Sequence, residues 1–265
     1  MMSEPLNYSS YLRLDDLLRQ QVPRSLGSHG PEHDEMLFIV IHQVYELWFK
    51  QMLHEFDYLA ERLRGGEHAR AIHTLQRLRA ILKTIVAQVD ILETMTPLEF
   101  NAFRSYLESG SGFQSVQFRE VEFVMGLKRE NIFKHYPPET FGLDRLRRRF
   151  DEPTLWDAFL AYLALRGYAV PADQLGRDVA QPLKPAPALQ AILIEIYRAD
   201  AAVSNICERL VDLDEGFMEW RYRHIKMVER TIGGKPGTGG SPGAAYLATT
   251  VRPFFPDLWE IRSQL

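Results

Sequence analysis

Apolar residues recur at helical spacing through most of the chain. After Asp34, which can cap a helix, they follow at steps of three and four. They are Leu37, Ile41, Val44, Leu47, Trp48 and Met52. Large apolar side chains, among them Phe38 and Tyr45, also fill much of the opposite side of this segment. The pattern therefore predicts a long helix that is buried nearly all round.

A second long helix is predicted from about Glu67 to Glu93, with an apolar stripe from Ile72 to Leu92. Gly65-Gly66 between the two patterns is typical of a tight turn, so we expect the two helices to form an antiparallel pair. Further helical patterns are predicted at 97–107, 113–126, 140–150, 154–166, 187–213 and 215–232. Alternation of period two is almost absent, so strands are at most a minor feature.

The expected fold is all-α, a single domain over residues 1–265. We expect a bundle of about four long helices with smaller helices around it. Two segments interrupt the helical pattern. Residues 170–187 contain four prolines and predict an irregular crossover. Residues 233–243 hold six of the 17 glycines, which predicts a mobile loop that serves either as a functional lid or as a plain connector.

Charge and cysteine content narrow the class of protein. Lys plus Arg is 31 and Asp plus Glu is 35, a net charge of −4, which argues against nucleic acid as a partner. A single cysteine, Cys207, excludes an internal disulfide and a cysteine-based zinc cluster. No apolar run approaches the ~18 residues of a membrane span, and the N-terminal residues do not resemble a signal peptide. We therefore expect a cytoplasmic protein without a membrane partner.

The histidines offer the clearest candidate chemistry. No histidine has Glu three residues before it, and H-E-x-x-H is absent, which argues against di-iron and zinc-protease sites. His42 and His224, however, lie inside strongly apolar helical patterns. A neutral imidazole on an apolar wall suits haem iron, with one histidine as ligand and another lining the opposite side. A hydrogen-bonded core histidine is the alternative at both positions.

Two further motifs are candidates for a functional role. Arg104 follows Phe100 and Phe103, and an arginine among aromatic rings can hold a carboxylate in two parallel hydrogen bonds, although an ordinary surface arginine would have the same pattern. Residues 239–243 match G-x-S-x-G, but Pro242 has no N–H to donate to an oxyanion, which argues against a hydrolase.

Five blocks of sequence, in order, resemble the tryptophan 2,3-dioxygenase family. They are residues 34–50 (DEMLFIVIHQVYELWFK), 8–15 (YSSYLRLD), 92–97 (LETMTP), 103–115 (from Phe103-Arg104 to Gln114-Ser115) and 220–224 (WRYRH), the last leading into 237–241 (GTGGS). The resemblance spans nearly the whole chain, and several spaced blocks are more specific than any single motif.

The resemblance implies an all-α protein with one haem b per subunit, bound in the bundle and ferrous when active. It also implies a homotetramer, a dimer of dimers, which inserts both atoms of O2 into the C2–C3 bond of the indole of L-tryptophan. The product would be N-formyl-L-kynurenine, in the first step of tryptophan catabolism by the kynurenine pathway. A broader indoleamine dioxygenase, and a catalytically silent haem-binding or tryptophan-sensing protein, remain as alternatives.

Residue by residue, the resemblance makes His224 the proximal iron ligand. His42 matches the distal histidine that meets the indole N–H and assists catalysis, and Phe38 matches an aromatic contact to the indole. Ser111 and Phe103 match positions beside the haem.

The remaining matches concern the two ends of the amino acid and the neighbouring subunit. Arg104 matches the residue that binds the substrate carboxylate, and Thr238 the residue that meets the ammonium when the loop 233–243 closes. Phe100 stands in the substrate site where some relatives have Tyr, so Arg104 would carry more of the carboxylate recognition. In the N-terminal segment, residues 1–20, the side chains that match those reaching into a neighbouring subunit's pocket are Tyr8, Tyr11 and Leu12.

Overall fold

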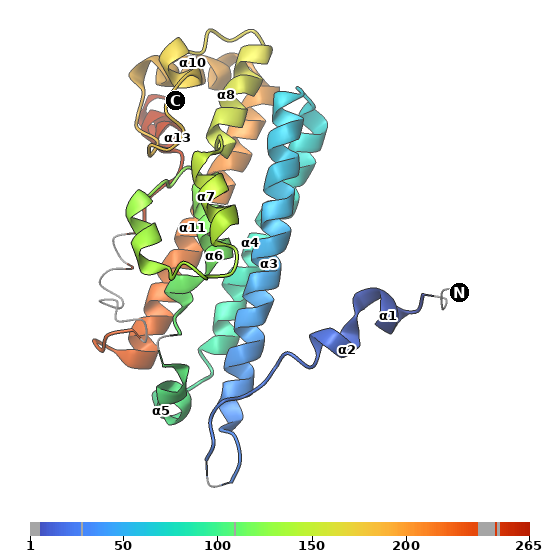
Figure 1. Ribbon diagram of the computed structural model, residues 1–265. Coiled ribbons are helices and arrows are strands. Elements are labelled where there is room, and N and C mark those ends of the chain that lie inside the picture. Colours follow the sequence, from blue (N-terminus) through green and yellow to red (C-terminus); the bar gives the residue numbers. More distant parts are fainter. Residues whose placement is uncertain (1–5, 28, 109, 238–246, 248–249) are drawn as a thin grey trace.

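Three long helices form the centre of the molecule. The computed structural model describes the chain except residues 1–5, 28, 109, 238–246 and 248–249. The long helices are α3 (His33–Arg64), α4 (His68–Leu92) and α11 (Ala201–Ile232), and α4 packs against both of the others (Figure 1). Two shorter helices, α6 (Val116–Val124) and α8 (Leu155–Leu165), pack along α3. They complete the bundle in place of a fourth long helix, and the all-α prediction is confirmed.

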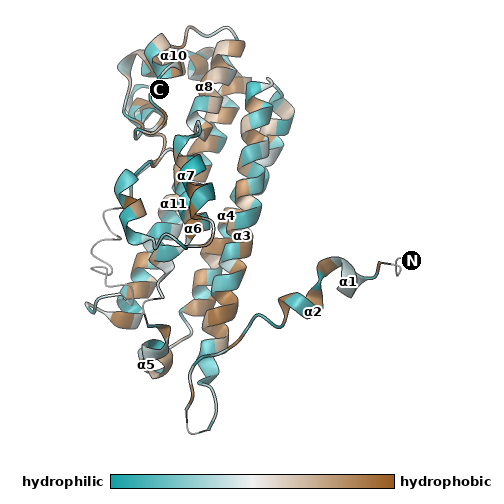
Figure 2. Cartoon of the chain, in the orientation of Figure 1, coloured by the Kyte–Doolittle hydropathy of each residue, from teal (hydrophilic) through white to brown (hydrophobic). Residues whose placement is uncertain are grey.

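The antiparallel pair of α3 and α4 follows directly from the sequence pattern. The apolar positions Ile41, Met52 and Phe56 of α3 are buried against Leu75 and Leu82 of α4. Gly66 has a φ of 72°, in the left-handed region that favours glycine, and allows the tight reversal between the two helices. Figure 2 shows hydrophobic and hydrophilic residues alternating around both helices, as expected of helices with one buried face.

The C-terminal helices divide at a different place from the one predicted. The break lies at Asp200, between α10 (Pro187–Ala199) and α11, where the carboxylate accepts hydrogen bonds from the N–H groups of Ala202 and Val203. The predicted break near residue 214 is wrong. Asp214 is buried inside α11, where its carboxylate accepts hydrogen bonds from the Phe254 and Phe255 N–H groups and the Trp259 indole.

Smaller elements cover the ends and one side of the bundle. They are α5 (Pro97–Arg104), η1 (Ser105–Leu107), η2 (Gly112–Gln114), η3 (Glu130–His135), α7 (Leu143–Asp151), α9 (Ala172–Leu175), α13 (Pro256–Glu260) and η4 (Ile261–Gln264). The predicted irregular crossover contains only the four-residue α9. Among the residues with a described structure, the only β pairing is one isolated bridge between Gly27 and Gly30.

The N-terminal segment stands away from the bundle. Helices α1 (Tyr8–Leu12) and α2 (Leu14–Leu17) project outward and contain no buried residue (Figure 1). The connection back to the bundle is fixed at the start of α3, where buried Glu35 accepts hydrogen bonds from the N–H groups of Arg24 and Ser25. Over the described residues, no helix is both long and apolar enough to cross a membrane.

Candidate active site

His42 is held on α3 with a defined tautomer. Its Nδ1 lies 2.7 Å from the carbonyl oxygen of Phe38, one turn earlier. Because a carbonyl oxygen can only accept, Nδ1 carries the proton, and Nε2 of the neutral ring is left as an acceptor. Burial lowers the pKa of His42, although the hydrogen bond to Phe38 and the charge of Glu46 act in the opposite direction. The side chain is therefore neutral at pH 7, with one acceptor nitrogen.

Aromatic rings form a wall beside His42. The Phe38 ring lies 4.1 Å from the imidazole, 5.9 Å from Phe100 and 5.5 Å from Phe103, measured between centroids. Phe100 and Phe103 are buried on α5 and meet edge to face at 5.4 Å. Helix α5 contacts both α3 and α11, so this wall lies between the two helices that carry the candidate histidines. The predicted residues Phe38, His42, Phe100 and Phe103 are thus brought together.

His224 lies on α11, within electrostatic reach of His42. Burial lowers the pKa of His224 to about 4, and electrostatic interactions with His42 and Arg119 lower it further. The imidazole is therefore neutral at pH 7, as a metal ligand must be. Trp220, one turn earlier on the same helix, stacks on its ring with centroids 5.3 Å apart and planes 8° from parallel. The two histidines singled out in the sequence thus belong to one region of the molecule.

Arg104 meets the glycine-rich segment. It ends α5, and its guanidinium Nη2 donates a hydrogen bond of 2.5 Å to the carbonyl oxygen of Pro236, just beyond α11. The structure thus places Arg104 against the beginning of the 233–243 segment, near the aromatic wall. Thr238, the predicted ammonium contact, lies outside the described residues.

A second segment, residues 111–115, is attached to α3 next to His42. Ser111 caps η2 and accepts a hydrogen bond from the N–H of Phe113. Ser115 donates a hydrogen bond to the Glu46 carboxylate, which also accepts one from Gln117. Glu46 lies one turn after His42 and was not identified from the sequence, although its spacing of four residues from His42 was a usable signal. It ties the Ser111 segment to the helix that carries His42.

The N-terminal candidates are not part of this region in their own subunit. Tyr8, Tyr11 and Leu12 are 76%, 73% and 42% exposed on α1, which points away from the bundle. No described contact joins them to His42, His224 or Arg104.

The donor set near His224 distinguishes between kinds of metal site. Among the described residues there is no group of three or more His, Cys, Asp or Glu side chains that could hold an ion. A single neutral imidazole on an apolar wall does not make a site for an isolated zinc or iron ion, which takes several protein ligands. It does fit haem, because the porphyrin supplies four ligands and the protein needs to supply only one.

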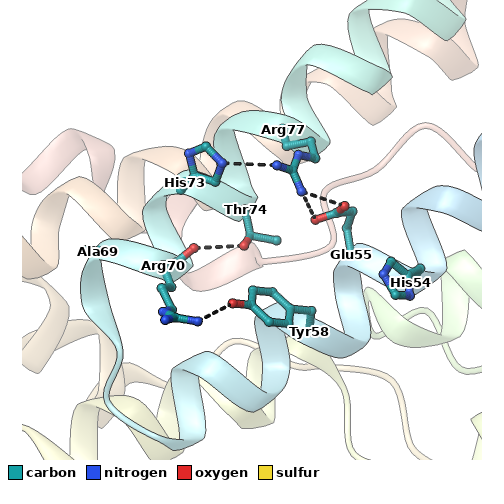
Figure 3. A pocket seen from close by; sticks show the side chains of 8 residues that line it. All are labelled: His54, Glu55, Tyr58, Ala69, Arg70, His73, Thr74 and Arg77. Atoms are coloured by element: carbon teal, nitrogen blue, oxygen red, sulfur yellow. Dashed lines mark hydrogen bonds and ion pairs between the residues drawn. The ribbon is translucent and has the colours of Figure 1, made fainter.

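Two surface grooves lie away from the candidate histidines. One groove, of about 460 Å³, lies between α3 and the segment after α7. A second groove, of about 400 Å³, lies between α3 and α4 (Figure 3). His54 and Tyr58 line both grooves. In the second groove the polar groups are paired with each other. Arg77 binds the Glu55 carboxylate at 3.0 Å, and Arg70 donates to the Tyr58 hydroxyl at 3.1 Å. Neither groove is lined by a predicted site residue.

The fold and the site define a class: an all-helical protein in which neutral histidines from two helices lie beside a wall of aromatic rings. The chain belongs to the tryptophan 2,3-dioxygenase family, whose sequence profile matches residues 1–162 and 177–265. A tryptophan 2,3-dioxygenase of Herpetosiphon aurantiacus is 64% identical over 264 residues, which cover 100% of both chains. Proteins of the same name are 55% identical in Anaeromyxobacter sp., over 99% of this chain and 97% of that one, and 41% identical in Caulobacter vibrioides, over 100% of both.

Proposed function

We propose that this protein is a tryptophan 2,3-dioxygenase. It inserts both atoms of O2 into the C2–C3 bond of the indole of L-tryptophan and releases N-formyl-L-kynurenine. The observation that carries the proposal is the acceptor nitrogen of neutral His42 beside the Phe38 ring, within electrostatic reach of neutral His224. This arrangement offers an indole an aromatic contact and a partner for its N–H at one place.

In this proposal His224 is the residue that would hold haem b, through its unprotonated ring nitrogen. The haem, when bound in its ferrous form, supplies the binding and activation of O2. The neutral state of His224 supports this role, because a protonated imidazole has no lone pair to offer the iron. Ser111 and Phe103 lie beside the haem in this proposal, and the buried Phe103 ring helps to exclude water.

His42 orients the substrate. Its Nε2 accepts the indole N–H, because its Nδ1 is already committed to the Phe38 carbonyl. The indole lies against Phe38, with Phe100 behind it. His42 assists the reaction by orientation and does not need to remove the N–H proton, since the indole carbons carry the bond-forming electrons.

Arg104 recognises the substrate carboxylate and Thr238 its ammonium group. The Arg104 guanidinium has donors in a fork that matches a carboxylate, and it lies at the edge of the aromatic wall. Phe100 has no hydroxyl to assist, so Arg104 carries most of this recognition. The carbonyl of Pro236 occupies one Arg104 nitrogen, which links the acid-binding residue to the 233–243 loop that closes over the substrate.

The working enzyme is a homotetramer, a dimer of dimers, in which the N-terminal segment 1–20 enters a neighbouring subunit's pocket. Tyr8, Tyr11 and Leu12 are exposed together on one projecting helix, which supports this proposal, because apolar side chains that are exposed together mark an interaction surface more often than single ones do.

A spectroscopic assay tests the proposed function. Haem-loaded, reduced protein is mixed with L-tryptophan in air, and the haem band and the near-ultraviolet absorption of the product are followed together. We expect a haem band and growing product with L-tryptophan, and much less product with tryptamine or D-tryptophan. Equal turnover of all three substrates would indicate a broader indoleamine dioxygenase. A haem band that responds to tryptophan without product would indicate a sensor, and either result would contradict the proposal.

A further inference from the structure

We propose that Trp220 is a positioning residue for His224, whose ring orientation it fixes by stacking. This inference rests on the proposed function, in which His224 is the haem ligand. Trp220 belongs to the same sequence block as His224, but no role follows from the sequence alone. Its indole and the imidazole are four residues apart on α11, where side chains of successive turns lie on the same face.

The geometry of the pair is that of a close, nearly parallel stack. The ring centroids are 5.3 Å apart and the planes differ by 8°. The torsion about the Cβ–Cγ bond of histidine is broad and roughly two-fold when nothing constrains it. A flat neighbour parallel to the imidazole restricts this torsion, because rotation would drive the edge of one ring into the face of the other.

Trp220 can perform this role because it is itself held in place. It is only 9% exposed, and three aromatic rings surround it. Phe118 of α6 lies 4.9 Å away, while Tyr45 and Phe49 of α3 meet its ring edge to face at 6.3 Å each. Tyr45 in turn donates a hydrogen bond to the carbonyl oxygen of Ile85 in α4. The orientation of Trp220 is therefore determined by rings from two other helices, α3 and α6, and one of these rings is itself anchored to α4.

The two histidines of the site are oriented by different means. His42 is fixed by a hydrogen bond from Nδ1 to a backbone carbonyl. Over the part of the chain that the structure describes, no comparable hydrogen bond to His224 is present, and the Trp220 stack is the contact that defines its plane. A histidine that ligates a metal usually has its ring set by a hydrogen bond at the second nitrogen. Here we infer that stacking supplies much of that orientation.

Stacking is compatible with ligation. The lone pair of an imidazole nitrogen lies in the ring plane, whereas Trp220 is stacked parallel to that plane. The indole therefore restricts the direction of the lone pair without blocking it. Without the stack, His224 should still bind iron. Its ring would take a wider range of orientations, however, and the haem should be lost faster.

The test uses the haem-loaded full chain and removes the flat ring in two ways, Trp220→Leu and Trp220→Met, while Trp220→Phe keeps an aromatic face. The iron–histidine stretching band of the ferrous protein is recorded by resonance Raman, and haem transfer to excess apomyoglobin is timed. Orientation of a metal ligand by its neighbours is typically worth 10- to 100-fold in affinity. We expect Leu and Met to broaden or shift the band and speed haem loss about 10-fold, and Phe to restore most of both.

Trp156→Leu is the matched control. Trp156 is a buried tryptophan of α8 that stacks on Phe255, with centroids 5.4 Å apart, and makes no contact with His224. The Trp156→Leu substitution should lower the melting temperature without changing the iron–histidine stretching band or the rate of haem loss. An unchanged band in both the Leu and Met variants, or equal haem loss in the Trp156 variant, would overturn the inference. Normal haem ligation in His224→Ala would instead overturn the proposed function, so the two failures are distinguishable.

Discussion

Replacement of Arg104 by Ala provides a quantitative test of how the substrate carboxylate is recognised. Truncating one partner of a buried, hydrogen-bonded charge pair costs about 2 to 5 kcal/mol. Arg104 is partly exposed, and its Nη2 donates a hydrogen bond to the Pro236 carbonyl, so a carboxylate would compete with that bond and part of the gain on binding would be offset. We therefore expect the lower part of the range, about 2 to 3 kcal/mol, or about 30- to 150-fold in kcat/KM for L-tryptophan.

The assay compares two substrates, L-tryptophan and tryptamine, in the wild-type protein and three variants. Tryptamine has no carboxylate, so its turnover should differ little between the wild-type protein and Arg104→Ala. Arg104→Lys keeps the positive charge but loses the forked pair of donors. Its kcat/KM for L-tryptophan should therefore lie between those of the wild-type protein and Arg104→Ala. Arg230→Ala removes an arginine whose side chain is 67% exposed on α11 and should leave both substrates unaffected. Equal losses for L-tryptophan and tryptamine would refute the assignment, because the carboxylate would then not be the group that Arg104 recognises.

Three further predictions concern the histidines and a buried ion cluster. His224→Ala should lose haem and activity together, measured by the haem band and product formation. His42→Ala should keep its haem and lose about 10-fold in kcat, the effect of an orienting group and less than the 10²- to 10⁴-fold of an acid–base catalyst. Burial would raise the pKa of Glu122, but the charges of Arg119, Arg129 and Arg221 lower it from 4.5 to about 2. The stability from this shift, about 3 kcal/mol, is complete above about pH 4.5 and lost as the pH falls toward 2, so Glu122→Gln should flatten the acid limb of a denaturation curve.

A specific result would contradict each of these three predictions. A His224→Ala protein with normal haem ligation would remove that residue from the iron. Complete inactivity of His42→Ala with intact haem and tryptophan binding would mean a direct chemical role in place of orientation. An acid limb of Glu122→Gln as steep as that of the wild-type protein would show that other carboxylates govern acid unfolding.

Local patterns predicted the helices, and long-range contacts determined where some of them end. The α3 and α4 pair followed from apolar spacing and a glycine turn, because both signals lie within one stretch of sequence. The predicted patterns 187–213 and 215–232 leave a boundary at Asp214, which the structure instead places inside α11. Its partners, the N–H groups of Phe254 and Phe255, lie 40 residues or more away and could not be inferred from local spacing.

In the candidate site, too, some features could be predicted from the sequence and others required the structure. His42 and His224 stood out because they are polar residues in apolar helices, and the resemblance to a family assigned their roles. The proton position on His42 needed the distance to the Phe38 carbonyl, and the stack of Trp220 needed the planes of two rings. The bond from Arg104 to Pro236 joins residues 132 positions apart. The pocket that Tyr8 and Tyr11 are proposed to enter belongs to a neighbouring copy of the chain, so contacts within one chain do not locate it.

The central claim, that both oxygen atoms of O2 enter the substrate, is tested most directly by isotope labelling. Haem-loaded protein is supplied with L-tryptophan under ¹⁸O2 in ordinary water, and the product is analysed promptly by mass spectrometry. We expect N-formyl-L-kynurenine that carries two ¹⁸O atoms from the same O2 molecule. A product with a single ¹⁸O atom, or tryptophan recovered unchanged from protein with a normal haem band, would contradict it.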